Sequence, residues 1–141
     1  MRLKLSQLQV MMLLLNKHWM QLMSFNRDEF YYRPTEPLGW WAGDIILGGR
    51  DELGGGTWLG STRDGTVAFL TNFREVESLL EPKTRGDLTI RFLQSKKSPQ
   101  EFAEKIVEEA HVYNGFNLVC IDICSFNLGC SERYNECMGQ S

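Results

Sequence analysis

The chain has 141 residues, enough for one domain, and its composition, 43% hydrophobic and 23% charged, is that of a globular protein. A formal net charge of −3 provides no basic surface for nucleic acid. No apolar run reaches the roughly 18 residues of a membrane-spanning helix. The four cysteines lie between Cys120 and Cys137, without the paired C-x2-C spacing of structural zinc sites. This pattern predicts reduced cytosolic thiols and no metal site.

Residues 1–24 are predicted to form an amphipathic helix that docks on the body of the protein. The segment contains no acidic residue, and its apolar residues recur at intervals of three and four, as on one helix face. It lacks the long apolar core and cleavage site of a secretory signal, but a mitochondrial targeting helix remains an alternative. The stripe consists of Leu8, Met11, Met12, Leu15, Trp19, Leu22 and Met23.

Glycine and tryptophan are concentrated in residues 26–72. Glycine allows close backbone approaches, and tryptophan offers a flat apolar face with one polar atom, so the stretch predicts tight turns packed against rings. These turns form either the wall of a site or only hairpins. Short strands are expected at residues 44–47, 57–61 and 66–71, with Arg63-Asp64-Gly65 as the turn between the last two.

The second half of the chain contains the clearest local signal, a capping box in which Ser98 precedes Pro99 and Glu101. It predicts a helix that ends near Asn114-Gly115. A shorter helix is expected over 85–94, a polar connector over 75–82, a strand over 116–123 and an irregular cysteine-containing tail over 124–141. The second helix is expected to bury Phe102, Ile106, Val107 and Ala110.

The order of short motifs resembles that of the NRDE-motif family, also called the transport and Golgi organization 2 family. The resemblance covers residues 26–122. The matching blocks are Asn26-Arg27-Asp28-Glu29-Phe30, Arg33-Pro34, Gly49-Arg50-Asp51, Gly55-Gly56-Thr57-Trp58-Leu59-Gly60, Leu70-Thr71-Asn72, Thr84-Arg85-Gly86-Asp87-Leu88 and Tyr113-Asn114-Gly115-Phe116-Asn117-Leu118.

The resemblance implies an α+β fold similar to the N-terminal-nucleophile (Ntn) hydrolases, an αββα sandwich of antiparallel strands packed with helices. The family's domain is longer than this chain. Residues 25–123 are therefore expected to be its N-terminal half, with the C-terminal half missing, as in a truncated isoform. Residues 1–24 would be a divergent start. Without the remaining strands, strand 116–123 or its neighbours should present an unpaired edge.

The resemblance also points to a candidate pocket. Arg27 and Asp28 would orient the surroundings of a nucleophile, and Asn72 could donate to an oxyanion. The alternatives are a buried salt bridge for the first two residues and a backbone-bonding strand end for Asn72. A ligand wall is expected around the tryptophans and one arginine, and Arg27, Asp28, Trp58 and Asn72 should converge on one pocket. The wall residues are Trp40, Trp41, Trp58 and Arg50.

Members of the family usually begin Met-Cys, and this chain has Arg2 in place of the nucleophile. We therefore expect a non-catalytic cytoplasmic factor that acts in Golgi organisation and protein secretion, with an unidentified small ligand and secretory-pathway proteins as partners. An Ntn-type amidohydrolase and a haem-mobilising protein are alternatives, as are Golgi-associated and mitochondrial locations. No cofactor is predicted, because His18 and His111 lie outside any haem-attachment motif.

Overall fold

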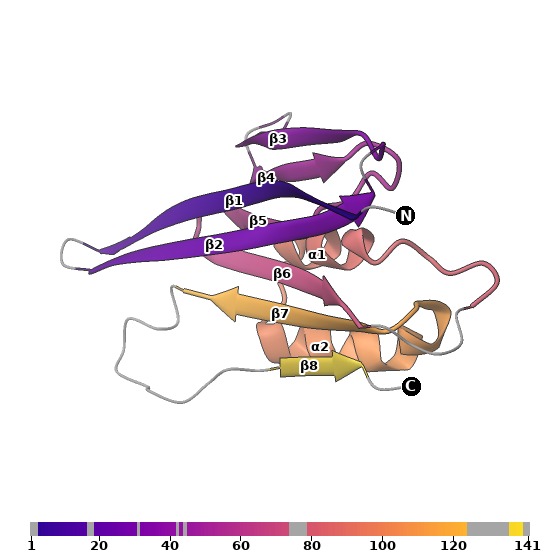
Figure 1. Ribbon diagram of the computed structural model, residues 1–141. Helices are drawn as coiled ribbons and strands as arrows, with labels where there is room; N and C mark the ends of the chain where they lie inside the picture. The colour runs from indigo at the N-terminus through magenta and orange to yellow at the C-terminus, as the bar shows by residue number, and fades with distance from the viewer. Residues whose placement is uncertain are drawn as a thin grey trace.

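The computed structural model describes residues 3–16, 19–30, 32–41, 43, 45–73, 79–123 and 136–139. Strands come first, two helices follow, and two further strands close the order (Figure 1). The elements are β1 Leu3–Asn16, β2 Trp19–Phe30, β3 Thr35–Trp40, β4 Ile46–Asp51, β5 Leu59–Thr62, β6 Thr66–Asn72, α1 Gly86–Gln94, α2 Pro99–Glu109, the 3-10 turn η1 Ala110–Val112, β7 Phe116–Asp122 and β8 Glu136–Gly139. No helix in these ranges is long and apolar enough to cross a bilayer.

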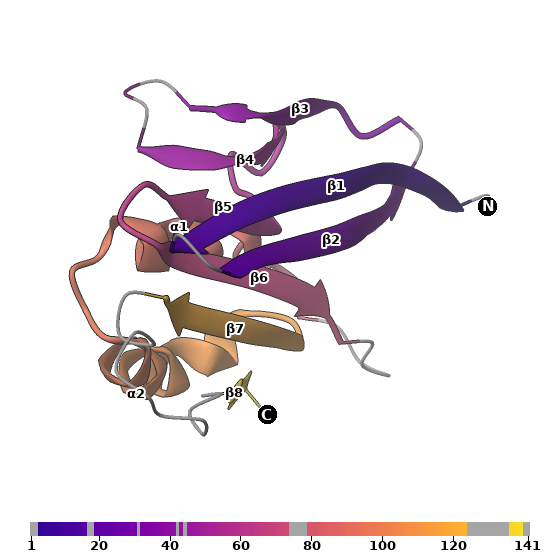
Figure 2. The same cartoon turned by 90° about the vertical axis from the view of Figure 1, so that its left-hand side faces the viewer.

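The strands form two separate antiparallel sheets. The β1–β2 hairpin is one sheet, and the other has six strands in the sequential order β3-β4-β5-β6-β7-β8. The hairpin lies across one face of the larger sheet, while α1 and α2 lie against the other face (Figures 1 and 2). This arrangement confirms the predicted α+β class.

The two-residue alternation of strand side chains divides the core between the two faces. On β6, Ala68 and Leu70 pack among the helix residues, whereas Val67 and Phe69 pack beneath the hairpin. The helix side buries Leu88 and Phe92 of α1 and Phe102 and Ile106 of α2, together with Phe116, Leu118 and Cys120 of β7. The hairpin side buries Trp58, Leu59, Val67 and Ile123, with Met23 and Phe25 of β2 packed against them.

The predicted hairpin of the larger sheet is confirmed. Strands β5 and β6 pair from Leu59↔Phe69 to Ser61↔Val67, and Gly65 in the turn has φ of 89°. That value lies in the left-handed region, which glycine adopts without a steric penalty. The Thr62 hydroxyl accepts from the Thr66 N–H at 3.2 Å, which closes the turn.

Both predicted helices are present, and the capping box is confirmed. Ser98 Oγ accepts from the Glu101 N–H at 3.3 Å, and Glu101 Oε2 accepts from the Ser98 N–H at 2.9 Å. Two details of α2 were wrong. It ends at Glu109 and passes into η1 rather than continuing to Asn114-Gly115. Val107 is 65% exposed, because it lies about 100° around the helix from buried Ile106.

The predicted helix over 1–24 is wrong. Residues 3–16 and 19–30 are paired antiparallel strands, in register from Leu3↔Phe30 to Asn16↔Trp19. The segment also carries a two-residue alternation, with Leu3 and Leu5 in one phase and Leu8 and Val10 in the other. The phase changes where the pairing has a register shift, between Leu5 and Gln7. Strand pairing, a long-range interaction, prevailed over a local helical spacing.

The expectation of a wholly irregular tail over 124–141 is also corrected. Residues 136–139 form β8, which pairs with β7 from Phe116↔Gly139 to Val119↔Glu136. Strand β7 is therefore paired on both sides, and β3 and β8 are the outer strands of the larger sheet. Cys124 and Cys130 lie outside the described residues, as do residues 74–78 of the predicted connector. The domain boundaries at residues 25 and 123 stay a prediction.

Candidate ligand-binding pocket

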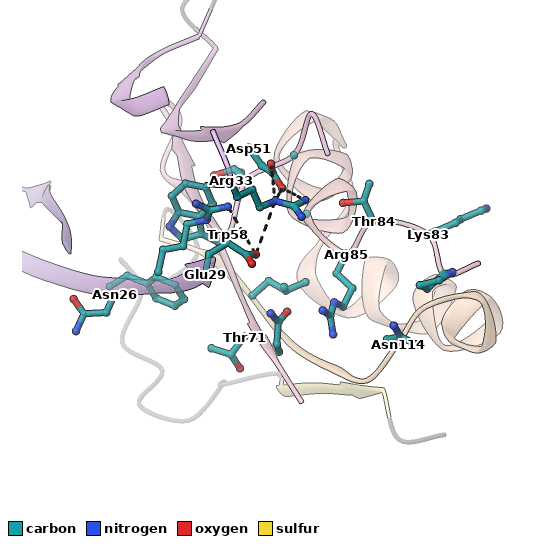
Figure 3. A pocket seen from close by; sticks show the side chains of 18 residues that line it. Asn26, Glu29, Arg33, Asp51, Trp58, Thr71, Lys83, Thr84, Arg85 and Asn114 are labelled. Atoms are coloured by element: carbon teal, nitrogen blue, oxygen red, sulfur yellow. Dashed lines mark hydrogen bonds and ion pairs between the residues drawn. The ribbon is translucent and has the colours of Figure 1, made fainter. Parts of the chain in front are cut away.

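A cavity of about 660 Å³ lies where the end of β2 passes the larger sheet and the segment leading into α1 (Figure 3). Three parts of the chain that are distant in sequence therefore share one site. Its lining consists of Phe25, Asn26, Arg27, Glu29, Arg33, Asp51, Gly56, Thr57, Trp58, Leu70, Thr71, Asn72, Pro82, Lys83, Thr84, Arg85, Gly86 and Asn114.

A direct contact between the backbones of two glycines, Gly56 and Gly86, brings α1 to the cavity. A Cβ on Gly56 would lie 2.4 Å from the carbonyl carbon of Gly86, so only glycine fits at position 56. The Thr57 N–H donates to the Gly86 carbonyl at 3.3 Å across the same contact. Arg85, the N-cap residue of α1, donates from Nη1 to the Gly115 carbonyl at 2.8 Å. The start of α1 is thereby fixed between the entry to β5 and the entry to β7.

An ion network forms one wall of the cavity. Arg33 Nη2 donates to Asp51 Oδ2 at 2.6 Å, and Arg33 Nε donates to both carboxylate oxygens at 3.0 Å. Burial acts to raise the pKa of Asp51, but the hydrogen bonds from Arg33, Gly54 and Leu53 outweigh it and lower the pKa below its usual value. Asp51 is thus held charged, and it fixes Arg33 through two-pronged hydrogen bonding.

Glu29 connects this network to a buried arginine on β2. Glu29 Oε2 lies 3.9 Å from Arg33 Nε and 3.9 Å from Arg27 Nη2. Arg27 is only 6% exposed, and its guanidinium lies 4.4 Å from the centroid of the Trp58 ring. Burial lowers the pKa of Arg27, and the charges of Asp51 and Glu29 oppose that shift. A cation over an indole face is stabilised by the negative potential of the ring.

Trp58 has a buried polar atom for which the described residues offer no hydrogen-bond partner. The residue is 7% exposed, and its Nε1–H has no hydrogen-bond partner in the described part of the chain. An unsatisfied buried donor costs about 1–3 kcal/mol, and the great majority of buried polar side chains are satisfied. Trp58, one of the exceptions in the described part of the chain, lines this cavity.

The structure brings together part of the predicted site. Arg27, Trp58 and Asn72 all line the cavity, whereas the Asp28 side chain lies outside the described residues. The roles assigned to them stay predictions.

The other predicted wall residues do not line this cavity. Arg63 lies over the Trp40 ring at 4.0 Å, and Arg50 lies over the Trp41 ring at 5.1 Å. The Trp41 indole N–H donates to the Gly48 carbonyl at 3.1 Å. These tryptophans belong to the β3–β4 end of the sheet, and Trp41 also packs against the helix-side core.

Sequence reasoning missed the residues that carry most of the charge. Glu29, Arg33, Asp51 and Arg85 line the cavity, and each stands inside one of the family motif blocks. In Gly49-Arg50-Asp51 the sequence analysis predicts the arginine as the ligand residue. Neighbouring strand residues point to opposite faces, and Asp51 is the one that lines the cavity. Arg33 could have been found by asking which carboxylate would pair with it.

The lining can bind and orient a molecule through charge and hydrogen bonds. It offers guanidinium, ammonium, hydroxyl and amide groups, and an apolar part made by Phe25, Trp58 and Leu70. In the described ranges no cysteine lines the cavity, and Cys120 is buried on the helix side of the sheet. The site is therefore a polar pocket of the size that small-molecule ligands occupy.

Fold and site together define an α+β protein in which motif residues line a charged pocket between two packed sheets. The chain belongs to the Transport and Golgi organisation 2 family, whose model matches residues 10–139. This confirms the family resemblance.

Individual relatives agree with this assignment. The Transport and Golgi organization protein 2 homologs of Bos taurus and Homo sapiens are each 39% identical over 106 residues, which cover 72% of this chain and 38% of the relative. The Drosophila melanogaster protein, Transport and Golgi organization protein 2, is 32% identical over 120 residues, 74% of this chain and 40% of the relative. The chain thus spans about two-fifths of the length of these relatives.

Proposed function

We propose that this chain is a non-catalytic cytoplasmic factor that binds a small ligand in the cavity and acts in Golgi organisation and protein secretion. The family membership and the names of the relatives support the cellular role. The observation that supports ligand binding is the convergence of Arg27, Trp58 and Asn72 on one cavity, from three different strands or strand entries. A buried arginine at a cavity wall is expensive for stability and therefore suggests a binding role.

A binding role agrees better with the lining than catalysis does. Arg27 is held on the Trp58 ring and Arg33 is held by Asp51, so both guanidinium groups are positioned in advance. Preorganised charge serves binding without requiring a nucleophile. Amidohydrolase chemistry would need an activated thiol or hydroxyl beside a base. The described hydroxyls of the lining belong to Thr57, Thr71 and Thr84, and Thr57 donates its hydroxyl proton to the Leu59 carbonyl at 2.8 Å.

The Ntn-like architecture is part of the proposal. The β1–β2 hairpin packed on the larger sheet, with helices on the outer side of that sheet, would account for three of the four layers of an αββα sandwich. The shorter length of this chain relative to its relatives supports the view that the match covers only part of that domain.

Blocking the cavity tests the proposal. Asn72 is exposed and lines the cavity, whereas Asn117 is exposed on the neighbouring strand and does not line it. We expect Asn72→Trp to occlude the site and Asn117→Trp to leave it open. In cells that lack their own family member and secrete slowly, wild type and Asn117→Trp should restore secretion, and Asn72→Trp should not.

Native mass spectrometry of the chain recovered from cytosol supplies the second readout. Wild type and Asn117→Trp should retain a stoichiometric small molecule that Asn72→Trp loses, and incubation should leave that molecule chemically unchanged. Equal rescue by both variants with no bound mass would contradict the proposal. Turnover of an acyl-amide panel by wild type, absent in Asn72→Trp, would establish the hydrolase alternative in its place.

A further inference from the structure

The charge of the cavity lining is uneven. Four basic and two acidic side chains line it among the described residues, in a chain whose formal net charge is −3. Both carboxylates lie on the Arg33 side, whereas Arg85 lies on the side where α1 begins (Figure 3). Lys83 belongs to the same side, and its exposed side chain extends away from Arg85 (Figure 3). An acidic protein has therefore concentrated positive charge in its cavity.

The two carboxylates neutralise positive charge on the Arg33 side only, because Arg33 and Arg27 bind them there. Asp51 accepts from two nitrogens of Arg33, and Glu29 lies 3.9 Å from both Arg33 and Arg27. The Glu29 carboxylate also accepts from the Phe30 N–H at 2.9 Å. A ligand that enters the cavity therefore meets a neutralised wall on one side and a basic wall on the other.

The basic wall coincides with the N-terminus of α1, a nine-residue helix. Thr84, Arg85 and Gly86 line the cavity there, and the helix start has no side-chain cap. The Asp87 and Leu88 N–H groups donate to the Thr84 and Arg85 carbonyls at 3.3 and 3.0 Å, so the backbone itself closes the first turn. The helix dipole still favours an anion at this end. Asp87 in the first turn does not line the cavity and lies 3.9 Å from Arg91.

The buried donor of Trp58 is an independent indication of a ligand. Its Nε1–H lies in the wall of the same cavity without a partner in the described part of the chain. Trp58 is also close to α1 in space, because Gly56, two residues earlier, contacts Gly86 directly. An acceptor oxygen from a ligand, reached once the adjoining side chains shift, would complete this hydrogen bond.

We propose that the ligand is an organic oxyanion, a carboxylate or phosphate on an apolar body. The anionic group binds Arg85 and the start of α1, the body lies against Phe25, Trp58 and Leu70, and an acceptor oxygen takes the Trp58 N–H. This inference rests on the proposed function, that the cavity holds a small ligand. It adds the charge and the orientation of that ligand.

A matched set of four compounds tests it. Benzoate and phenyl phosphate carry the two anionic groups on one ring, and benzamide and benzylamine are the neutral and cationic counterparts. Each is titrated into the ¹⁵N-labelled chain at pH 7 and constant ionic strength. The reporters are the backbone amides of Thr84, Arg85 and Gly86 and the Trp58 indole N–H, which Trp58→Phe identifies by its loss.

Both anions should shift these resonances and bind at least about tenfold more tightly than benzamide or benzylamine, since hydrogen bonds to charged groups contribute about 1.5–3 kcal/mol. The tighter of the two anions tells carboxylate from phosphate. Arg85→Gln should weaken anion binding about tenfold, and Lys97→Gln, the same charge change at an exposed site outside the cavity, should not. Lys83→Gln replaces Arg85→Gln if the latter does not fold.

Two results would overturn the inference, and each can be told apart from a failure of the proposed small-ligand binding. If benzamide or benzylamine binds at the same resonances as tightly as the anions, the cavity is a ligand site without anion preference. If neither anion shifts the reporters, the oxyanion assignment fails, and small-ligand binding is then decided separately by the mass retained in wild type and lost in Asn72→Trp.

Discussion

The two faces of the larger sheet are built on different principles. The helix-covered face is closed by a continuous apolar cluster, from Leu88 and Phe92 of α1 to Phe116 of β7. The hairpin-covered face has a smaller apolar cluster around Leu59 and Val67 and borders the cavity. Burying apolar side chains stabilises a fold, whereas burying an arginine does not do so by itself. Apolar packing is therefore concentrated on the helix-covered face, whereas the charged cavity lies where Leu70 of that core and the start of α1 meet the end of the hairpin.

The strongest test of this comparison is Phe92→Ala, which opens a cavity in the helix-covered face. Phe92 is fully buried and packs on Phe102 with a ring-centroid distance of 5.2 Å. We expect the free energy of unfolding to fall by about 4 kcal/mol, measured by chemical denaturation. Val107→Ala, on the exposed side of α2, should change it by less than about 0.5 kcal/mol. Similar losses in both variants would mean that the helices do not stabilise the fold through this face.

A second test acts at the junction between the faces. In Gly56→Ala the new methyl group would overlap the backbone of Gly86, which cannot rotate away as a side chain can. We expect a loss of about 3 kcal/mol by thermal or chemical unfolding. Gly39→Ala is the matched control, because the nearest atom to its added Cβ is the Pro37 carbonyl oxygen at 4.0 Å. A fully stable Gly56→Ala would contradict the close approach that positions α1 at the cavity.

A third test removes the ion pair of the cavity wall and follows stability as a function of pH. Arg33→Ala leaves Asp51 in a half-buried site without its guanidinium N–H donors. We expect it to lower the free energy of unfolding by about 2 kcal/mol at pH 7. The pKa of Asp51 is lowered in the folded chain, so its contribution is complete above the ordinary aspartate value of about 3.9 and is lost as pH falls through the folded-state pKa. The difference between wild type and Arg33→Ala should therefore shrink below about pH 4.

Denaturation curves from pH 7 down to pH 3 would measure this difference. Asp51→Asn in the Arg33→Ala background serves as the control, and its stability should not follow the same pH dependence. A difference between wild type and Arg33→Ala that grows in acid would show that another group dominates the wall.

The smallest expected effect is at the outer edge of the helix-covered face. Ser98→Ala removes the acceptor of the capping box and should lower the free energy of unfolding by about 1 kcal/mol. Ser98→Asp retains an acceptor for the Glu101 N–H and should keep most of that stability. Calorimetric unfolding of the two variants separates the cap from a general effect of substitution, and equal melting temperatures for both would count against the cap.

Local signals predicted the elements whose structure is determined nearby. Ser98 and Glu101 are three residues apart, and Gly65 follows Asp64 directly, so the start of α2 and the β5–β6 turn could be predicted from the sequence. The N-terminal hairpin could not, because Leu8 to Met23 fit helical spacing and only pairing over the length of the hairpin selects strands. The predicted burial of Val107 was wrong because an apolar side chain need not lie on the buried face of a helix.

The candidate site was predictable where motifs indicated its residues, and not where it depends on strand register or on a long-range contact. Shared motifs indicated Arg27, Trp58 and Asn72, and the fold brings all three to the cavity. Choosing between Arg50 and Asp51 requires knowing which way each side chain points from β4, and that depends on the register with β3 and β5. The basic wall depends on the Gly56–Gly86 contact, which joins segments 30 residues apart and leaves no periodic signal.

The separation of the two sheets has a consequence for any molecule in the cavity. Asn26 and Arg27 belong to the hairpin, whereas Trp58 precedes β5 and Leu70 lies in β6 of the larger sheet, so the cavity spans two hydrogen-bonded units. A ligand that contacts both sheets would connect the hairpin to the larger sheet, in addition to the side-chain packing between them. Its binding free energy then stabilises the packing of the hairpin on the larger sheet. Hydrogen exchange of the β2 amides should therefore slow when the ligand is bound.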